Sequence, residues 1–363
     1  VKLPEDVNFV AGATSPLETS EAFLHCKCPQ CGADATRETD TMDTFIDSSW
    51  YFLRYCDPHN TEEPFAKDKA NYWMPVDLYI GGIEHAILHL LYSRFFMKVL
   101  QDEGMVDYPE PFTNLLCQCM VLKDGGKMSK SVGNVVSPEE IVGKYGADTA
   151  RLFILFAAPP EKDLEWSDQG VEGSYRFLKR VWNIVGKYED IQTEEKGKLS
   201  SDEFALRRKL HQTIKKVTED LDGKFAFNTA ISAIMELVND MYRFIEAHDT
   251  IEASLSGELV RNLLILLAPF VPHMTEELWQ GAGQKEESIH LAAWPACDES
   301  ALVVDEVELA VQVNGKVRAT ISVPVAMARE EIGEKAQALP EIQKFTEGKT
   351  IVKVIVVPKR IVN

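Results

Sequence analysis

The spacing of apolar residues changes twice along this chain, and no other sequence feature limits its fold as strongly. Between Met74 and Leu122, short apolar runs flank one helical stretch. From Ala147 to Ala268, apolar residues recur at the spacing of helices that bury one face. Beyond Pro295 they alternate, which favours strands. A chain of 363 residues is long enough for two or three cores, so we predict a multidomain protein with α/β, all-α and α+β parts.

The first periodic region predicts part of a nucleotide-binding unit. Pro75–Ile80 is a short apolar run, two glycines follow, and a helical pattern continues from Ile83 to about Gln101. Strand, tight turn and helix in this order form half of a βαβ unit. A second apolar run, Leu115–Leu122, leads into the loop Lys123–Ser131, which we expect at the C-terminal edge of a parallel sheet. Further upstream, Phe45–Tyr51 is strand-like.

The middle of the chain predicts a helical bundle of four or five members. Ser137-Pro-Glu-Glu140 has the pattern of a capping box that opens a helix ending at Tyr145. Gly, Pro or polar breaks then separate segments with apolar residues at helical spacing. We expect these helices over residues 147–158, 171–187, 202–221, 226–246 and 256–268.

The last segment predicts a small α+β domain. Leu309–Val313 and Lys316–Ile321 alternate in polarity and are joined by Asn314-Gly315, the residue pair that a type I′ hairpin turn favours. A helix near Arg329–Leu339 and a strand over Ile351–Val357 complete this domain.

Composition restricts the compartment. Seven unevenly spread cysteines argue against a disulfide framework and favour a reducing cytoplasm. The longest apolar runs, such as Leu263–Val271, are shorter than the roughly 20 residues of a membrane span, so we predict no membrane segment. No secretory signal precedes Pro4. Because the chain starts at Val1, we interpret it as a fragment or a processed piece.

The charge is distributed unevenly. A net charge of −19 would repel nucleic acid if it were spread evenly. However, residues 174–216 contain 11 Lys and Arg against 6 Asp and Glu, and the last twenty residues hold five cations against Glu347 alone. These segments are two candidate anion-binding surfaces, although a charged helix face is more often simply solvated.

Cysteines near the N-terminus suggest zinc as one interpretation. Cys26, Cys28 and Cys31 include a Cys-x-x-Cys pair, which is half of a structural zinc site. No convincing second pair exists, because Cys56-Asp-Pro-His59 follows the strand-like segment. We therefore predict no metal site and interpret these residues as a degenerate knuckle or as ordinary thiols. A zinc site is the alternative.

Two motifs suit phosphate chemistry. Gly81-Gly-Ile-Glu-His85 lies at the expected strand-to-helix junction, where free N–H groups favour an anion, although a plain turn with packed histidines has the same pattern. Lys127-Met-Ser-Lys-Ser131 places two ammonium groups in a glycine-flanked loop, which suits charge that builds up on a departing pyrophosphate. Its alternative is a solvated surface loop, but its position between a strand and a capped helix favours the functional interpretation.

Five segments together resemble the leucyl-tRNA synthetases. Lys127–Ser131 is similar to the KMSKS signature of class I aminoacyl-tRNA synthetases, and Thr39–Tyr51 resembles the leucyl members in particular. The likeness continues through Tyr79–Tyr92, Tyr145–Arg151 and Val311–Arg318, and it covers essentially the whole chain.

The resemblance implies a reaction, its partners and its residues. Leucine attacks the α-phosphorus of ATP with Mg²⁺ present, and the leucyl group then passes from the adenylate to tRNA(Leu). The implied catalytic residues are Lys127 and Lys130. The implied ATP-binding residues are Gly81, Gly82, Glu84, His89, Met120, Val121, Met128 and Lys130. The implied leucine-binding residues are Phe45, Ser48, Tyr51 and His85. The tRNA-binding candidates are Arg176, Lys179, Arg180, Lys316, Arg318, Lys353, Lys359 and Arg360.

The resemblance also implies domain boundaries. We expect a connector with a Cys knuckle (1–38), the second half of a Rossmann-like catalytic domain (39–135), a stem-contact-like junction (136–170), a helical anticodon-binding-type domain (171–295) and a C-terminal α+β tRNA-binding domain (296–363).

Three departures from the family pattern matter. The HIGH motif is absent, and so is the editing domain that such enzymes need because small apolar side chains differ by only about 1–3 kcal/mol in binding. Cys119 stands where we expect Gly beside the adenine. We therefore expect the chain to be inactive without the N-terminal half of the same enzyme. The alternatives are another aliphatic class I synthetase and a non-catalytic tRNA-binding module.

Overall fold

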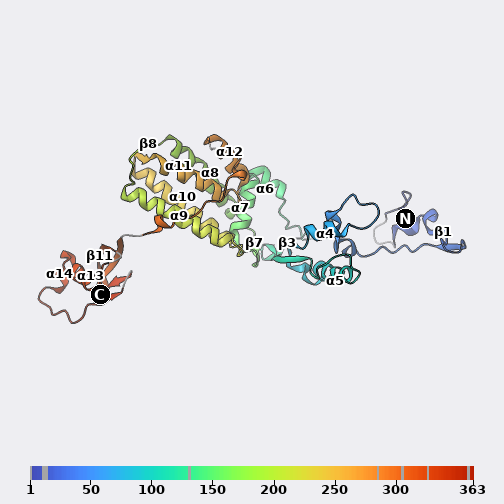
Figure 1. The fold of residues 1–363 in the computed structure, drawn as a ribbon, viewed down its shortest axis with the longest axis horizontal. Helices are drawn as coiled ribbons and strands as arrows, with labels where there is room; N and C mark the ends of the chain where they lie inside the picture. Colours follow the sequence, from blue (N-terminus) through green and yellow to red (C-terminus); the bar gives the residue numbers. More distant parts are fainter. Residues whose placement is uncertain are drawn as a thin grey trace. The chain divides into compact units, whose positions relative to one another are not determined.

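The structure is a computed structural model that describes residues 2–9, 15–129, 132–283, 286–303, 306–324, 327–357 and 360–363 (Figure 1). The chain divides into two compact units: Val1–Val121 with Pro160–Asp163, and Leu122–Pro159 with Leu164–Asn363. Helices and strands occur in both, in agreement with the predicted multidomain class. Within the described ranges, no helix is long and apolar enough to cross a membrane.

The first unit is organised around two parallel strands. β3 (Val76–Gly82) pairs with β4 (Phe112–Gln118), and η2 (Ile83–Ile87) and α5 (His89–Asp102) connect them. The predicted order of strand, turn and helix is therefore confirmed. The remaining elements are η1 (Pro16–Thr19), α1 (Glu21–Leu24), β1 (His25–Lys27), β2 (Asp34–Thr36), α2 (Phe45–Ser48), α3 (Tyr51–Cys56) and α4 (Lys67–Trp73).

The strand-like interpretation of residues 45–51 is wrong, because this segment forms α2 and the start of α3. The Asp43 carboxylate accepts a hydrogen bond from the Phe45 N–H at 2.8 Å, and the Ser48 and Ser49 hydroxyls donate to the Phe45 carbonyl. These local bonds satisfy backbone groups that a strand would give to a neighbour. A run of seven residues is too short for its apolar spacing to separate a strand from a helix.

Two further predicted elements are divided. The helix expected from Ile83 to Gln101 breaks at Leu88, whose φ of −113° and ψ of −105° lie outside the helical region. The run Leu115–Leu122 is also divided, because the Cys119 N–H donates to Pro160 O and the Met120 N–H to the Asp163 carboxylate, both at 2.9 Å. Apolar periodicity does not report backbone partners that are this distant in sequence.

The second unit begins with a small sheet and a capped helix. β5 (Val121–Lys123) lies between β6 (Gly126–Lys127) and β7 (Leu164–Glu165). α6 (Pro138–Tyr145) follows, with Ser137 at its N-cap and Pro138 in its first turn as predicted. The Ser137 side chain makes no capping hydrogen bond, so the predicted capping box is wrong. A capping box does form at Ser200 and Glu203, where the helix Ser201–Leu221 (α9) starts.

The helical bundle is confirmed, and most helix ends lie close to those predicted. The helices are α7 (Ala147–Ala157), α8 (Asp168–Asp190), α9 (Ser201–Leu221), α10 (Phe227–Ala247), α11 (Ala253–Leu267) and α12 (Pro272–Gly281), of which α12 was not predicted. β8 (Gln192–Glu194) pairs with β9 (Thr250–Glu252) in parallel. The core is rich in fully buried Leu, Ile and Val, each of which stabilises the bundle by about 1.5–3 kcal/mol.

Two side chains of α7 join the start of the bundle to its far end. The buried Asp148 carboxylate accepts hydrogen bonds from the Met274 N–H at 2.7 Å and from His273 Nδ1 at 2.8 Å, so it caps the N-terminus of α12. Arg151 donates to the carbonyls of Pro269 and Phe270, which precede this helix. Charged partners therefore satisfy backbone groups at the turn between α11 and α12.

The C-terminal region is a four-stranded sheet with two helices. β10 (Glu306–Val313) and β11 (Lys316–Pro324) form the predicted hairpin, and Asn314 and Gly315 have φ of 52° and 77°, as a type I′ turn requires. α13 (Arg329–Gln337) matches the predicted helix, whereas α14 (Pro340–Thr346) was not predicted. The strand expected over Ile351–Val357 shortens to β12 (Val356–Val357), which pairs with β13 (Ile361–Val362).

The Asp148 cap provides a test of this fold. We expect Asp148→Ala to destabilise the bundle by about 0.5–2 kcal/mol, because it removes the carboxylate that caps the first turn of α12 and leaves the Met274 N–H without its partner. Denaturation, together with hydrogen exchange of the α12 amides, measures the effect. Asp249→Ala, at an exposed site, is expected to change stability by less than about 0.5 kcal/mol. Equal effects of the two substitutions would contradict the assignment.

Candidate functional site

In the first unit, the residues predicted to bind leucine line one pocket. Phe45, Ser48 and Tyr51 come from α2 and α3, and His85 comes from η2. Together with Thr44 and His89 they enclose about 320 Å³. The Phe45 ring stacks on Tyr92 of α5, with centroids 5.9 Å apart and planes 8° apart. The pocket therefore has aromatic walls and a few polar groups, as sites for small organic ligands usually do.

A chain of hydrogen bonds holds this pocket in place. Tyr51 Oη lies 2.8 Å from Tyr79 Oη, and Tyr79 Oη lies 2.7 Å from His89 Nε2. On its other side, His89 Nδ1 lies 3.3 Å from the Ser48 hydroxyl. Tyr79 also stacks on Phe112 of the neighbouring strand, with centroids 3.8 Å apart. The aromatic residues of α3 are thereby tied to β3 and α5.

Burial shifts the pKa values of Tyr79 and His89, which lie at the centre of these hydrogen bonds. Burial, followed by the hydrogen bond from Tyr51, raises the pKa of Tyr79 well above its ordinary value, so the phenol stays protonated. Burial also lowers the pKa of His89, and the charge of His85 lowers it further. A neutral imidazole has one N–H donor and one acceptor nitrogen, so it suits a chain with a hydroxyl on each side.

A second pocket, of about 210 Å³, lies at the end of β3. Gly81, Gly82, His85 and His89, all predicted site residues, line it with Cys117 and apolar neighbours. The two histidines line both pockets and therefore separate them. His85 Nδ1 is buried and has no hydrogen-bond partner among the described residues. An unsatisfied buried polar atom costs about 1–3 kcal/mol, which a ligand at this point would recover.

Glu84 folds back over the glycine turn. A β-carbon on Gly82 would lie 2.2 Å from a Glu84 carboxylate oxygen, whereas one on Gly81 would meet nothing within 4 Å. A side chain at position 82 would therefore displace the Glu84 carboxylate, and Gly81 leaves open space beside the strand. The Glu84 side chain is exposed at the carboxyl end of β3, the edge where α/β sheets bind ligands.

The loop with the two predicted catalytic lysines belongs to the second unit. Asp124 and Gly125, with φ of 57° and 73°, turn β5 into β6, and the exposed Lys127 ends β6. Asn134, which the sequence analysis did not single out, closes the loop: its Oδ1 accepts from the Ser129 N–H at 2.8 Å, and its amide nitrogen donates to the Lys127 carbonyl at 3.3 Å. Lys130 lies outside the described residues. An Asn beside a glycine-flanked loop was the available sequence signal.

The remaining ATP candidates divide between the two units. Met120 and Val121 follow the break after β4, and the Met120 N–H is bound to Asp163 rather than free for an adenine. Met128 is half-buried in the loop after β6. Cys119, predicted to stand in place of Gly, donates from its thiol to the Glu161 carbonyl at 3.0 Å. Tyr79 begins a segment that resembles the family but was not predicted as a site residue; it lines the second pocket and is hydrogen-bonded to Tyr51 and His89, which line the first.

The Cys knuckle forms a tight hairpin between β1 and β2. The Cys28 N–H donates to the Ala33 carbonyl and the Gly32 N–H to the Cys28 carbonyl, both at 2.9 Å. Hydrogen bonds from the backbone of Cys31 and of Gln30 lower the pKa of the Cys28 thiol. In the described part of the chain, no group of three or more His, Cys, Asp or Glu side chains converges as metal ligands would.

The tRNA-binding candidates are exposed cations on two surfaces. On α8, the Lys179 ammonium lies 4.6 Å from the Tyr175 ring centroid, and the Arg180 guanidinium lies 4.9 Å from that of Tyr242. Arg176 is exposed beside them. The other group lies in the C-terminal region and consists of Lys316, Arg318, Lys353 and Arg360, while Lys359 falls outside the described residues.

Comparison with known proteins decides the family. A family described as "tRNA synthetases class I (I, L, M and V)" matches residues 10–167, and one described as "Anticodon-binding domain of tRNA ligase" matches residues 203–332. Leucine--tRNA ligases of Thermotoga petrophila and Thermotoga maritima are each 52% identical over 369 residues, which is 100% of this chain and 45% of theirs. The chain belongs to the class I tRNA synthetases. It spans about 45% of the length of these curated relatives.

Solved structures agree with this assignment. The Agrobacterium radiobacter K84 protein described as a LeuRS-tRNA-LeuAMS ternary complex has a TM-score of 0.73 and 38% identity, over 98% of this chain and 45% of that one. Mycobacterium tuberculosis methionyl-tRNA synthetase with methionyl-adenylate has a TM-score of 0.53 and 20% identity, over 71% of this chain and 52% of that one. At that identity the second comparison supports a shared fold only.

The lowered pKa of His89 predicts how the stability of the fold depends on pH. Above about pH 6.5, His89 is neutral in both the folded and the unfolded chain, and below it the unfolded chain takes the proton first, so acid destabilises the fold. We expect His89→Gln to flatten the loss of stability between pH 7 and pH 5 by up to about 1.4 kcal/mol per pH unit, measured by denaturation at each pH. His59→Gln, at an exposed position of the same unit, should keep the original slope. A parent slope retained in His89→Gln would refute this account.

Proposed function

We propose that this chain forms part of an ATP-dependent ligase that attaches leucine to tRNA(Leu) through a leucyl-adenylate. The observation that carries the proposal is the pocket of Phe45, Ser48, Tyr51 and His85, held by the hydrogen bonds from Tyr51 through Tyr79 to His89. The similarity of the whole chain to leucine--tRNA ligases supports leucine as the amino acid.

The chemistry of this pocket suits a branched aliphatic side chain. Phe45 and Tyr51 offer apolar ring faces, and burying a leucine side chain against such faces contributes about 1.5–3 kcal/mol. His85 Nδ1, which lacks a partner among the described residues, would take a polar group of the substrate. Because its pKa is lowered, His89 is neutral near pH 7 and does not place a buried charge beside an apolar ligand.

We infer that ATP binds beside the second pocket, at the carboxyl end of β3. Open space next to Gly81 would admit the nucleoside, and the Glu84 carboxylate would accept hydrogen bonds from two ribose hydroxyls. A carboxylate oxygen of leucine then bonds to the α-phosphorus, and the bond to the bridging oxygen of pyrophosphate breaks. A terminal ribose hydroxyl of tRNA next attacks the leucyl carbonyl, and AMP leaves. No covalent bond to the enzyme forms in either step.

Lys127 and Lys130 would stabilise the departing pyrophosphate. Lys127 is exposed at the end of β6, where its ammonium group can meet an anionic ligand. The Asn134 bonds to Ser129 and to the Lys127 carbonyl would hold the loop in shape. Mg²⁺ would accompany the ATP phosphates, whose oxygens are the ligands that it prefers. Alignment and charge stabilisation are the main requirements of such displacements.

The other partner, tRNA(Leu), would bind along α8 and on the C-terminal sheet. Their exposed cations would neutralise phosphates within a chain whose net charge is −19. Arg318, whose guanidinium lies 4.3 Å from the Phe345 ring centroid, is held ready for such a contact. The cytoplasm would be the place of action, where thiols such as these seven free cysteines stay reduced. Because the chain spans less than half of its relatives, activity would need the rest of the enzyme.

Leucine-dependent pyrophosphate exchange by the full-length enzyme tests the pocket. We expect Phe45→Ala to raise KM for leucine by about 10- to 150-fold, because it removes one apolar wall worth about 1.5–3 kcal/mol. Tyr72→Ala, which truncates a 78% exposed aromatic residue of the same unit, should leave KM unchanged. Exchange of equal or greater efficiency with isoleucine, valine or methionine would reject leucine as the substrate.

The loop lysine tests the chemical step. We expect Lys130→Ala in the full-length enzyme to slow adenylate formation by at least about 10²-fold in a single-turnover assay, through loss of a charge contact in the transition state. Lys335→Ala, an exposed lysine of α13, is the matched control. An unchanged rate in Lys130→Ala would remove this residue from the mechanism.

A further inference from the structure

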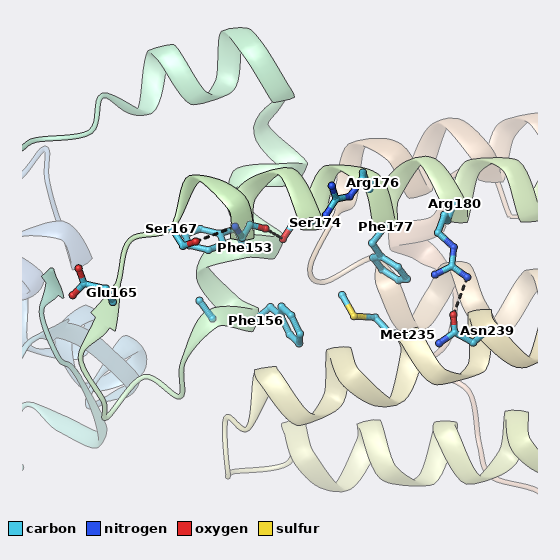
Figure 2. Close-up of a pocket in the computed structure, with 13 residues that line it drawn as sticks. Phe153, Phe156, Glu165, Ser167, Ser174, Arg176, Phe177, Arg180, Met235 and Asn239 are labelled. Atoms are coloured by element: carbon cyan, nitrogen blue, oxygen red, sulfur yellow. Dashed lines mark hydrogen bonds between the residues drawn. The ribbon is translucent and has the colours of Figure 1, made fainter. Parts of the chain in front are cut away.

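A cavity of about 680 Å³ lies in the second unit, outside every motif that the sequence analysis marked as catalytic (Figure 2). It is bounded by α7, β7, α8 and α10. Figure 2 shows Phe177 and Arg180 of α8 pointing toward Met235 and Asn239 of α10, with Phe156 of α7 beside them. The volume lies within the range of about 300–1,000 Å³ that is typical of small-ligand sites.

The interior of this cavity is aromatic and rigid. Phe153 and Phe177 are only 3% and 5% exposed, whereas Phe156 and Met235 are half-buried, pack against the bundle core and also line the cavity. A β-carbon on Gly170 would lie 2.7 Å from the Phe153 ring, so the glycine lets α8 rest directly on that ring. Phe153 is therefore held by close packing, and the part of the Phe156 ring that lines the cavity offers an aromatic surface to a ligand.

The rim of the cavity is cationic. Arg180 donates to the Asn239 amide oxygen at 2.8 Å and lies over the Tyr242 ring, so its guanidinium is oriented in advance. Arg176 is exposed and also lines the cavity. Of the described residues that line the cavity, only Glu165 is acidic, and its carboxylate accepts from the Gly125 N–H at 3.2 Å. Lys187, 5.6 Å from the Tyr242 ring centroid, extends the positive charge along α8.

We propose that this cavity binds one unpaired nucleoside of the tRNA. The base would stack on Phe156 beside Met235, its edge would meet the Asn239 amide, and its flanking phosphates would lie on Arg176 and Arg180. A flat apolar interior with guanidinium groups at the rim is complementary to an unstacked base joined to phosphates, the feature by which proteins commonly recognise single-stranded RNA. This inference rests on the proposed function and adds a specific contact to it.

Affinity measurements on the full-length enzyme test the stacking contact. We expect Phe156→Leu, which keeps most of the apolar volume but loses the ring, to weaken binding of a tRNA(Leu) transcript by about 5- to 100-fold. Arg176→Ala should lower the slope of log affinity against log salt by about one. An unaltered thermal midpoint of Phe156→Leu shows that the fold is intact, and Phe95→Leu, at an exposed aromatic residue of α5 outside the cavity, is the matched control that should keep the parent affinity.

Photo-crosslinking identifies the occupant. Met235→p-benzoylphenylalanine should attach to one unpaired nucleotide of the transcript, while Ser232→p-benzoylphenylalanine, on an exposed face of α10 outside the cavity, should not. Attachment of the position 235 probe to another part of the enzyme would overturn the inference and assign the cavity to a protein contact. Unchanged affinity of Phe156→Leu, with normal tRNA binding by the parent, would also overturn it while leaving the proposed function intact. Failure of the parent to bind tRNA(Leu) would reject the proposed function itself.

Discussion

The hydrogen bond between Tyr79 Oη and His89 Nε2, 2.7 Å long and partly buried, is the contact on which the candidate site depends. It joins β3 to α5 across the break at Leu88, and it continues through Tyr51 to the helices that carry Phe45 and Ser48. In a region of low dielectric, such a bond costs more to break than one in water, because each polar atom would remain without a partner. The pocket is therefore shaped before any ligand arrives.

A second constraint acts in the bundle, where charged groups on α7 bind backbone atoms more than a hundred residues away. Asp148 caps α12, and Arg151 binds the carbonyls just before that helix. The apolar core of α8, α9, α10 and α11 stabilises the bundle as a whole. Asp148 and Arg151 bind the backbone at the point where α12 begins. Both residues lie within Tyr145–Arg151, a segment that resembles the leucyl family. Their contacts in this chain are with the bundle itself, which explains their role by packing.

Much of the architecture could be predicted from the sequence, since it depends on patterns that are local. Helical spacing gave the ends of α9 and α10 to within a residue, and Asn314-Gly315 gave the hairpin, because only residues that tolerate positive φ fit such a turn. Errors occurred where distant partners decide the backbone. Residues 45–51 became helices, the run at 115–122 was divided by Pro160 and Asp163, and the strand near the end shortened to Val356–Val357.

The site shows the same division. The sequence by itself determined which residue types are present: the two glycines after β3, the histidines four positions apart, and the pair of loop lysines, which are covalent facts of composition and spacing. Only the tertiary structure decided that Phe45 would meet His85 in one pocket, that Tyr79 would link the two sides, and that Asn134 would close the loop. The physical reason is that these contacts join side chains far apart in sequence, and their geometry depends on how the buried strands and helices pack.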